Sequence, residues 1–149
     1  MKTNLLTIVV AIVMIMAGSS CKSNKGAGTE IPFNEYSRTE FSFRAENFSP
    51  DDRVIVINND DDLEKYTIKE DGSFAIDFDR YSLILARGFT TSTVAGIEKY
   101  LTSTSRHSYT LYVDVELGMG AHPEGWLILL QVPKLPSNAK VKLIETQHT

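Results

Sequence analysis

The chain has 149 residues, enough for one domain of the usual size of roughly 100–150 residues. A formal charge of −4 and a pI near 5.3 argue against nucleic acid as a partner, because cationic side chains supply most of the affinity for phosphate backbones. Cys21 is the only cysteine, which excludes a disulfide framework within one chain.

The first residues have the three-part pattern of an export signal. Lys2 provides a positive start, an apolar run covers 5–17, and small residues at 18–20 precede Cys21. The apolar run is shorter than the roughly 20 residues that a transmembrane helix needs. We therefore predict a signal peptide at 1–20, with cleavage between Ser20 and Cys21.

A cysteine placed directly after small residues resembles the lipobox of bacterial lipoproteins, although Gly18 stands where that motif commonly carries Leu. The resemblance implies that Cys21 receives a diacylglyceryl group and becomes an acylated first residue. Several acyl chains are enough for stable membrane anchoring. The alternatives are plain secretion with an unmodified Cys21 and an uncleaved membrane anchor.

The segment 21–30 is expected to be the lipidated cysteine and a flexible tether, because 22–30 is rich in Lys, Ser, Asn and Gly. No Asp follows Cys21, so the inner-membrane retention signal of some lipoproteins is missing and an outer-membrane location is expected. No acidic run of the surface-export type follows either, which favours the periplasm-facing side. A single globular domain is predicted at 31–149.

The first half of this domain predicts strands and one short helix. A strand is expected at 39–45, with Phe41 and Phe43 on one face. The β-branched run 54–57 predicts a strand buried on both faces. Acidic residues at 60–62 predict the start of a helix of about two turns, and 81–86 predicts a central strand that ends at Gly88.

The second half predicts further strands. A strand with a bulge at Gly96 is expected over 90–101, followed by a polar turn at 103–107. Strict alternation over 109–117 predicts a half-buried antiparallel strand. The last two strands are expected at 126–132 and 141–144.

The predicted fold class is α+β dominated by an antiparallel β-sheet, arranged as a meander with one short helix packed on it. Short turns between consecutive strands support this arrangement. An all-β sandwich or barrel is the alternative.

Several segments spread over the mature chain form a pattern of their own, namely 31–33 with Tyr36, 54–58, 63–66, 76–78, 82–86 and 126–135. Together they resemble a family of uncharacterised small lipoproteins of Bacteroidetes. A more local resemblance, through Asp77-Phe78, Gly88 and the following hairpin, is to the carboxy-terminal domain of the PrcB family of protease-complex proteins. It implies a protein-binding accessory role.

The acidic residues give two candidate sites with plain structural alternatives. Asn58, Asp60 and Asp62 have the spacing that begins an EF-hand loop, but Leu63 and Lys69 stand where that loop needs Gly and Glu, which favours helix capping. Asp77 and Asp79 form a local pair, whereas glycosidase carboxylates usually converge from separate segments. We interpret them as turn carboxylates.

Histidine and serine patterns do not predict a metal or a hydrolase site. His107, His122 and His148 lack the two- or four-residue spacing of metal ligands. Ser105 lies near His107 without an orienting acid in the sequence pattern. We therefore expect no metal, no cofactor and no assigned catalytic residue.

The glycine-rich loop 118–125 is the candidate recognition loop. It leads into a strand rather than a helix, which argues against phosphate binding. Met119, His122, Glu124 and Trp126 are its candidate contact residues, because loops of this length often bind partners. The alternative is a hairpin connection with Trp126 in the core.

These observations favour a non-enzymatic, lipid-anchored envelope module that binds a protein or a glycan. One alternative is an envelope hydrolase that acts on glycans through dispersed carboxylates. The other is a purely structural envelope lipoprotein.

Overall fold

The computed structural model describes residues 28–37, 40–69 and 75–149. The predicted signal peptide, the Ser20–Cys21 cleavage point, the Cys21 lipidation site and most of the predicted tether lie outside these residues. None of the helices in the described ranges has the length and apolar character needed to span a membrane.

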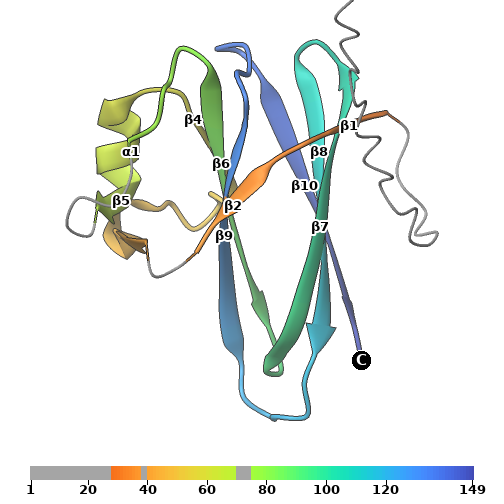
Figure 1. Ribbon diagram of the computed structural model, residues 1–149. Coiled ribbons are helices and arrows are strands. Elements are labelled where there is room, and N and C mark those ends of the chain that lie inside the picture. The colour runs from red at the N-terminus through yellow and green to blue at the C-terminus, as the bar shows by residue number, and fades with distance from the viewer. Residues whose placement is uncertain (1–27, 38–39, 70–74) are drawn as a thin grey trace, which may run out of the picture.

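Two four-stranded sheets lie face to face as a sandwich (Figure 1). Sheet A has the order β1-β7-β8-β10, with bounds Thr29–Ile31, Val94–Ser105, Ser108–Leu117 and Lys140–His148. Sheet B has the order β2-β9-β6-β4, with bounds Asn34–Tyr36, Glu124–Pro133, Tyr81–Thr90 and Val54–Ile57. The run from β1 to β2 crosses from one sheet to the other (Figure 1).

The main hydrophobic core fills the space between the sheets. Alternate residues of β8 face it and are buried, while Thr110, Tyr112 and Asp114 on the other face stay partly exposed, which confirms the predicted half-buried strand. Each fully buried Leu or Val contributes about 1.5–3 kcal/mol. The buried members are Ile84, Ala86, Leu101, Tyr109, Leu111, Val113, Val115, Trp126, Ile128, Leu130, Val132 and Leu135.

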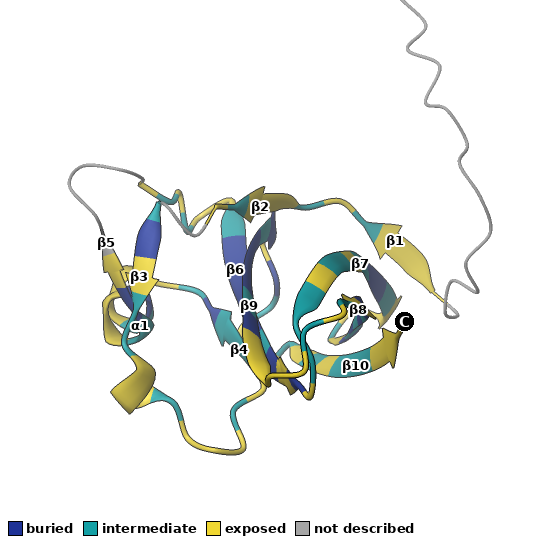
Figure 2. Ribbon diagram, turned by 90° about the horizontal axis from the view of Figure 1, so that it is seen from below, coloured by how far each residue is buried: buried dark blue, intermediate teal, exposed yellow. Residues whose placement is uncertain are grey.

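A third layer covers the outer face of sheet B, so that β6 and β9 lie buried in the middle of the molecule (Figure 2). It consists of helix α1 with the 3-10 helix η1 and the paired strands β3 and β5. Leu83, Leu85 and Leu129 of sheet B pack against Leu63 of the helix. The bounds are α1 Asp60–Tyr66, η1 Ala45–Asn47, β3 Phe41–Phe43 and β5 Thr67–Lys69. We call these elements the α1 layer.

Helix α1 begins where the sequence predicted it. Asn59 is the N-cap: its Oδ1 accepts the Asp62 N–H at 2.7 Å, and its Nδ2 donates to Asp62 Oδ2 at 2.8 Å. Asp60 and Asp61 lie in the first turn, where the helix dipole favours negative charge. Helix capping by this acidic run is confirmed, with Asn59 rather than Asn58 as the cap.

The predicted fold class is confirmed in the described residues, since mainly antiparallel sheet is accompanied by one short α-helix packed on a sheet face. The strand 54–57 packs on both faces as predicted. Val54 and Val56 contact the main core, and Ile55 and Ile57 contact the cluster under the α1 layer.

The connections differ from the predicted meander. Strands β6 and β7 are consecutive in the chain but lie in different sheets, and β10 pairs with β8 in parallel. The chain leaves sheet A after β8, runs through β9 in sheet B and returns, so β10 runs in the same direction as β8. Alternation identifies the buried face of each strand but not its neighbour.

The predicted tether is too long by two residues, because Thr29 and Glu30 belong to β1. They pair with Ser103 and Thr102 of β7. A short edge strand gains backbone hydrogen bonds without needing apolar side chains, so composition alone does not identify it.

The predicted end of a strand at Gly88 is also wrong, because β6 continues to Thr90. Gly88 faces the core, where a Cβ atom would lie 2.4 Å from Cζ2 of Trp126. This glycine is therefore needed for close packing. The predicted bulge is confirmed by a register shift between Val94 and Gly96, but β7 starts at Val94 rather than at residue 90.

Candidate functional site

The predicted recognition loop is held against the turn between β6 and β7. The Gly118 N–H donates to Thr93 O at 2.7 Å, and the Thr93 N–H donates to Gly120 O at 3.1 Å. The Ser92 hydroxyl donates to Gly118 O at 2.7 Å. These contacts fix the loop at one end of the sandwich.

The four candidate residues of this loop do not converge on one point. Met119 is fully exposed and His122 is exposed, whereas Trp126 is only 2% exposed in the core. Glu124 Oε2 accepts the Val94 N–H at 2.7 Å. A recognition role for the loop stays a prediction, and Trp126 occupies the core position of the alternative interpretation.

A hollow of about 480 Å³ lies between the sheets, and we call it the inter-sheet slot. Its polar groups are engaged within the protein: Lys99 Nζ lies 2.7 Å from Glu35 Oε2, and Glu124 holds the Val94 backbone. The lining residues are Glu35, Tyr36, Ser37, Val94, Ile97, Lys99 and residues 124–128. Burial, and secondarily the Glu40 carboxylate, raise the pKa of Tyr36 above its ordinary value of 10.0.

Phe89 is the only exposed Phe, Tyr or Trp side chain among the described residues, with 74% of its surface exposed. It lies on the outer face of β6, beyond the Leu83 and Leu85 positions that the α1 layer covers. Its register partner in β9 is Gly125, where a Cβ atom would lie 3.2 Å from Phe89 Cε1. The ring therefore packs over the glycine and keeps much of its surface open to solvent.

Two hollows meet at Phe89 and share Arg87, Gly88 and Phe89 as lining residues. The hollow on the α1-layer side has about 430 Å³ and is also lined by Phe41, Ser42, Phe43, Gly125, Trp126 and Leu127. The hollow on the β10 side has about 330 Å³ and is also lined by Pro50, Arg53, Glu145 and Gln147. We call the two hollows and the ring between them the Phe89 surface.

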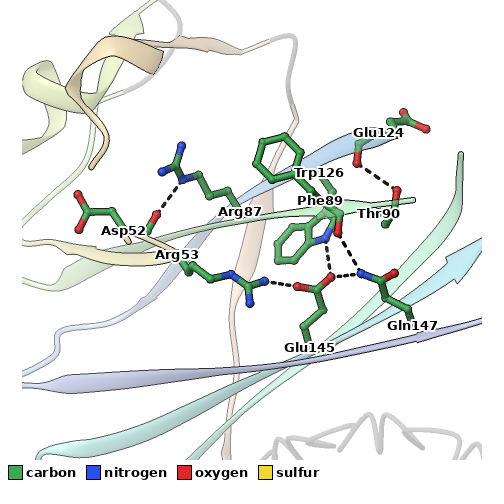
Figure 3. A network of polar contacts seen from close by, with 9 residues as sticks. All are labelled: Asp52, Arg53, Arg87, Phe89, Thr90, Glu124, Trp126, Glu145 and Gln147. Atoms are coloured by element: carbon green, nitrogen blue, oxygen red, sulfur yellow. Dashed lines mark hydrogen bonds and ion pairs between the residues drawn. The ribbon is translucent and has the colours of Figure 1, made fainter. Parts of the chain in front are cut away.

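A polar network centred on Glu145 builds the β10 side of this surface (Figure 3). The Glu145 carboxylate, in a side chain only 10% exposed, forms an ion pair with Arg53 and accepts from Trp126 Nε1 at 3.2 Å. It also accepts from Gln147 Nε2 at 2.6 Å, and the same amide donates to Phe89 O at 3.0 Å. The network connects β10 of sheet A to β6 and β9 of sheet B.

Arg87 is fixed between the two hollows by backbone groups. Its Nε donates to Asp52 O at 2.8 Å and its Nη2 donates to Ser49 O at 2.6 Å. The guanidinium carbon lies 4.8 Å from the centre of the Phe48 ring. The side chain is therefore held in place without a carboxylate partner among the described residues.

The candidate carboxylates Asp77 and Asp79 lie in a turn before β6. Asp77 O accepts the Tyr81 N–H at 2.9 Å, and Asp77 Oδ1 accepts the Asp79 N–H at 3.1 Å. Both residues are exposed and line none of the hollows described above. Their geometry agrees with the interpretation as turn carboxylates.

The three histidines lie on separate elements. His107 is in the turn between β7 and β8, His122 is in the loop before β9, and His148 in β10 contacts Asp114 Oδ1 at 3.0 Å. Ser105 ends β7 and pairs with Ser108 across that turn. Across residues 28–37, 40–69 and 75–149, no group of three His, Cys, Asp or Glu side chains is placed to hold a metal ion.

The residues of the Phe89 surface were not identified as candidates from the sequence. The available signal was the alternation of Leu83, Leu85, Arg87 and Phe89 on one face of a strand that contains a glycine. This alternation can be recognised in the sequence only if Gly88 is assigned to the strand interior.

Comparisons with known proteins give no relative from which a role could be transferred. No protein family, no curated protein and no solved structure matches this chain.

Proposed function

We propose that this chain is a lipid-anchored cell-envelope protein whose folded domain is a non-enzymatic glycan-binding module. The observation that carries the proposal is Phe89, an exposed aromatic ring between two hollows lined by hydrogen-bonding side chains. The Phe89 surface is the binding site in this proposal.

The chemistry of a sugar ring matches the two components of this surface. The apolar C–H face of a pyranose packs on an aromatic face, whose negative quadrupole attracts the C–H groups. Its hydroxyl groups need both donors and acceptors nearby. Arg87 supplies donors, and the side-chain oxygen of Gln147 supplies an acceptor. Hollows of about 430 and 330 Å³ suit a ligand of one or two rings.

The carboxylates of the surface favour binding over hydrolysis. Glycosidases use two carboxyl groups separated by about 5–9.5 Å across the scissile bond. Among the described residues that line the two hollows, Glu145 is the only carboxylate, and Arg53, Trp126 and Gln147 already engage it. The alternative of a hydrolase with dispersed carboxylates has less support.

The envelope location rests on the sequence before the folded domain. Small residues at 18–20 precede Cys21, and acylation there would hold the domain at a membrane. The proposed location is the outer membrane, on the periplasm-facing side. Mass spectrometry should find fatty acid on the peptide that contains Cys21, and an unmodified peptide would contradict the anchor.

Glycan binding is tested with the protein extracted from membranes and applied to an array of neutral and acidic glycans. We expect saturable binding to a subset of glycans, and Phe89→Ala should weaken it about tenfold or more, because the aromatic face is lost. Ile68→Ala is the matched control, since it removes another exposed apolar side chain, in β5, that lines none of the hollows described above.

Two results would contradict the proposal. One is the absence of binding to every glycan on the array. The other is a protein partner, recovered by crosslinking, whose binding depends on Phe89 and persists after all glycan has been removed enzymatically.

A further inference from the structure

We propose that the ligand of the Phe89 surface carries a carboxylate and that Arg87 binds it. The inference rests on the proposed glycan-binding function and specifies the class of glycan, namely one that contains uronic acid or another carboxylated sugar.

The hydrogen bonds of Arg87 leave one edge of its guanidinium group open. The group has five N–H donors. Nε donates to Asp52 O and Nη2 donates to Ser49 O, so the edge formed by Nε and Nη2 is occupied. The end edge, with one N–H each from Nη1 and Nη2, has no partner among the described residues. Two parallel N–H groups of this kind match the two oxygens of a carboxylate.

The position of this edge is fixed before a ligand arrives. The two carbonyl acceptors belong to the loop that leads to β4, and the Phe48 ring lies 4.8 Å from the guanidinium carbon. An Arg side chain that is already ordered loses little conformational entropy on binding. Arg87 is therefore arranged as a receptor for an anion beside Phe89.

The charges around the two hollows agree with an anionic ligand. The charged lining residues are Arg53, Arg87 and Glu145, and Arg53 is paired with Glu145. Arg87 forms no ion pair among the described residues, so the lining of the two hollows carries one net positive charge, although the whole chain has a formal charge of −4. Asp52 contributes its backbone oxygen, and its carboxylate points away from Arg87 (Figure 3).

The main experiment compares two probes on the unaltered, membrane-extracted protein by calorimetry. Oligogalacturonate and the same oligosaccharide with methyl-esterified carboxyl groups share one sugar backbone and differ in the charge and the ester methyl group. Both are compared with the carboxylated and sulfated sugars of the array. We expect the acid form to bind roughly 10- to 100-fold more tightly than the ester, as for a charge-assisted pair. Its affinity should fall as salt concentration rises.

The second part of the experiment tests Arg87 itself. Arg87→Gln should remove the preference for the acid form. Arg87→Lys should retain part of this preference, because Lys keeps the charge but lacks two parallel N–H donors for bidentate binding. Arg106→Gln is the matched control, since this exposed arginine lies in the turn between β7 and β8 and lines none of the hollows described above. If Arg87→Gln fails to fold, the acid and ester comparison still decides whether the ligand carries a carboxylate, and Arg87→Lys still tests the role of Arg87.

The outcomes separate this inference from the function on which it rests. Equal binding of acid and ester, tightest binding to a neutral or sulfated sugar, or an unchanged preference in Arg87→Gln would overturn the inference and leave glycan binding standing. Failure of every glycan to bind would overturn both.

Discussion

The inter-sheet slot and the two hollows of the Phe89 surface have similar volumes but differ in how far the protein itself uses their polar groups. In the slot, Lys99 is paired with Glu35, and Glu124 holds a backbone N–H. At the Phe89 surface, an aromatic face is exposed, and one edge of Arg87 has no carboxylate partner in the part of the chain that the structure describes. Volume therefore does not distinguish a binding site from a packing gap. The presence of donors and acceptors that are not already paired within the protein does.

Trp126 lines both the inter-sheet slot and the Phe89 surface, and changing its contact with Gly88 should have the largest effect on stability. In Gly88→Ala the new methyl group would overlap the Trp126 ring, which should lower the free energy of unfolding by about 3 kcal/mol. Urea denaturation measures this. The control is Gly96→Ala, where the nearest atom is a flexible Glu116 carboxylate oxygen at 3.3 Å. Equal stability of the two variants would contradict the proposed packing role.

The Glu145 network should give the next largest effect. Glu145→Ala leaves the buried Trp126 N–H without an acceptor and Arg53 without its partner, so we expect a loss of about 2 kcal/mol in unfolding free energy. Glu145→Gln keeps an acceptor oxygen and should lose less. Thermal unfolding of both variants tests this order, and an equal loss would show that the tryptophan hydrogen bond contributes little.

Lys99→Gln tests whether the inter-sheet slot or the Phe89 surface binds the glycan. It removes the ion pair of the slot, so we expect a stability change of about 1 kcal/mol or less. Binding to the glycan array should stay unchanged, because Lys99 does not line the Phe89 surface. Loss of glycan binding in this variant would move the proposed site to the slot.

The smallest effect is a pH dependence at the slot. Burial and the Glu40 carboxylate raise the pKa of Tyr36, so the folded state holds the phenol proton more tightly than the unfolded state. This contribution to stability is complete below pH 10 and is lost as pH rises through the folded pKa. Unfolding free energies measured from pH 9 to pH 11 should fall less steeply in Tyr36→Phe than in the unaltered chain.

Local patterns predicted much of the fold. The nine alternating residues at 109–117 determined a strand with one buried face, and the acidic run at 60–62 located the helix. The sheet to which each strand belongs depends on contacts between distant segments. The parallel pairing of β10 with β8 is such a contact, and alternation does not encode it.

Less of the candidate site could be predicted. The sequence predicted a recognition role for the loop around Met119 and His122, because long loops often bind partners. Phe89 and Arg87 lie within a strand, and their importance depends on where the α1 layer ends. Glu145 and Gln147 come from the far end of the chain and reach β6 and β9 only after the two sheets have packed.

The pairing of β1 with the end of β7 separates the Phe89 surface from the point at which the described chain begins. Thr29 lies opposite Ser103, and the ten residues from Val94 to Ser103 span about 30 Å of extended strand. Phe89 lies near the other end of that strand, beside the β6–β7 turn. If Cys21 is acylated as we propose, the lipid would therefore join the chain upstream of the end of the sandwich opposite the Phe89 ring.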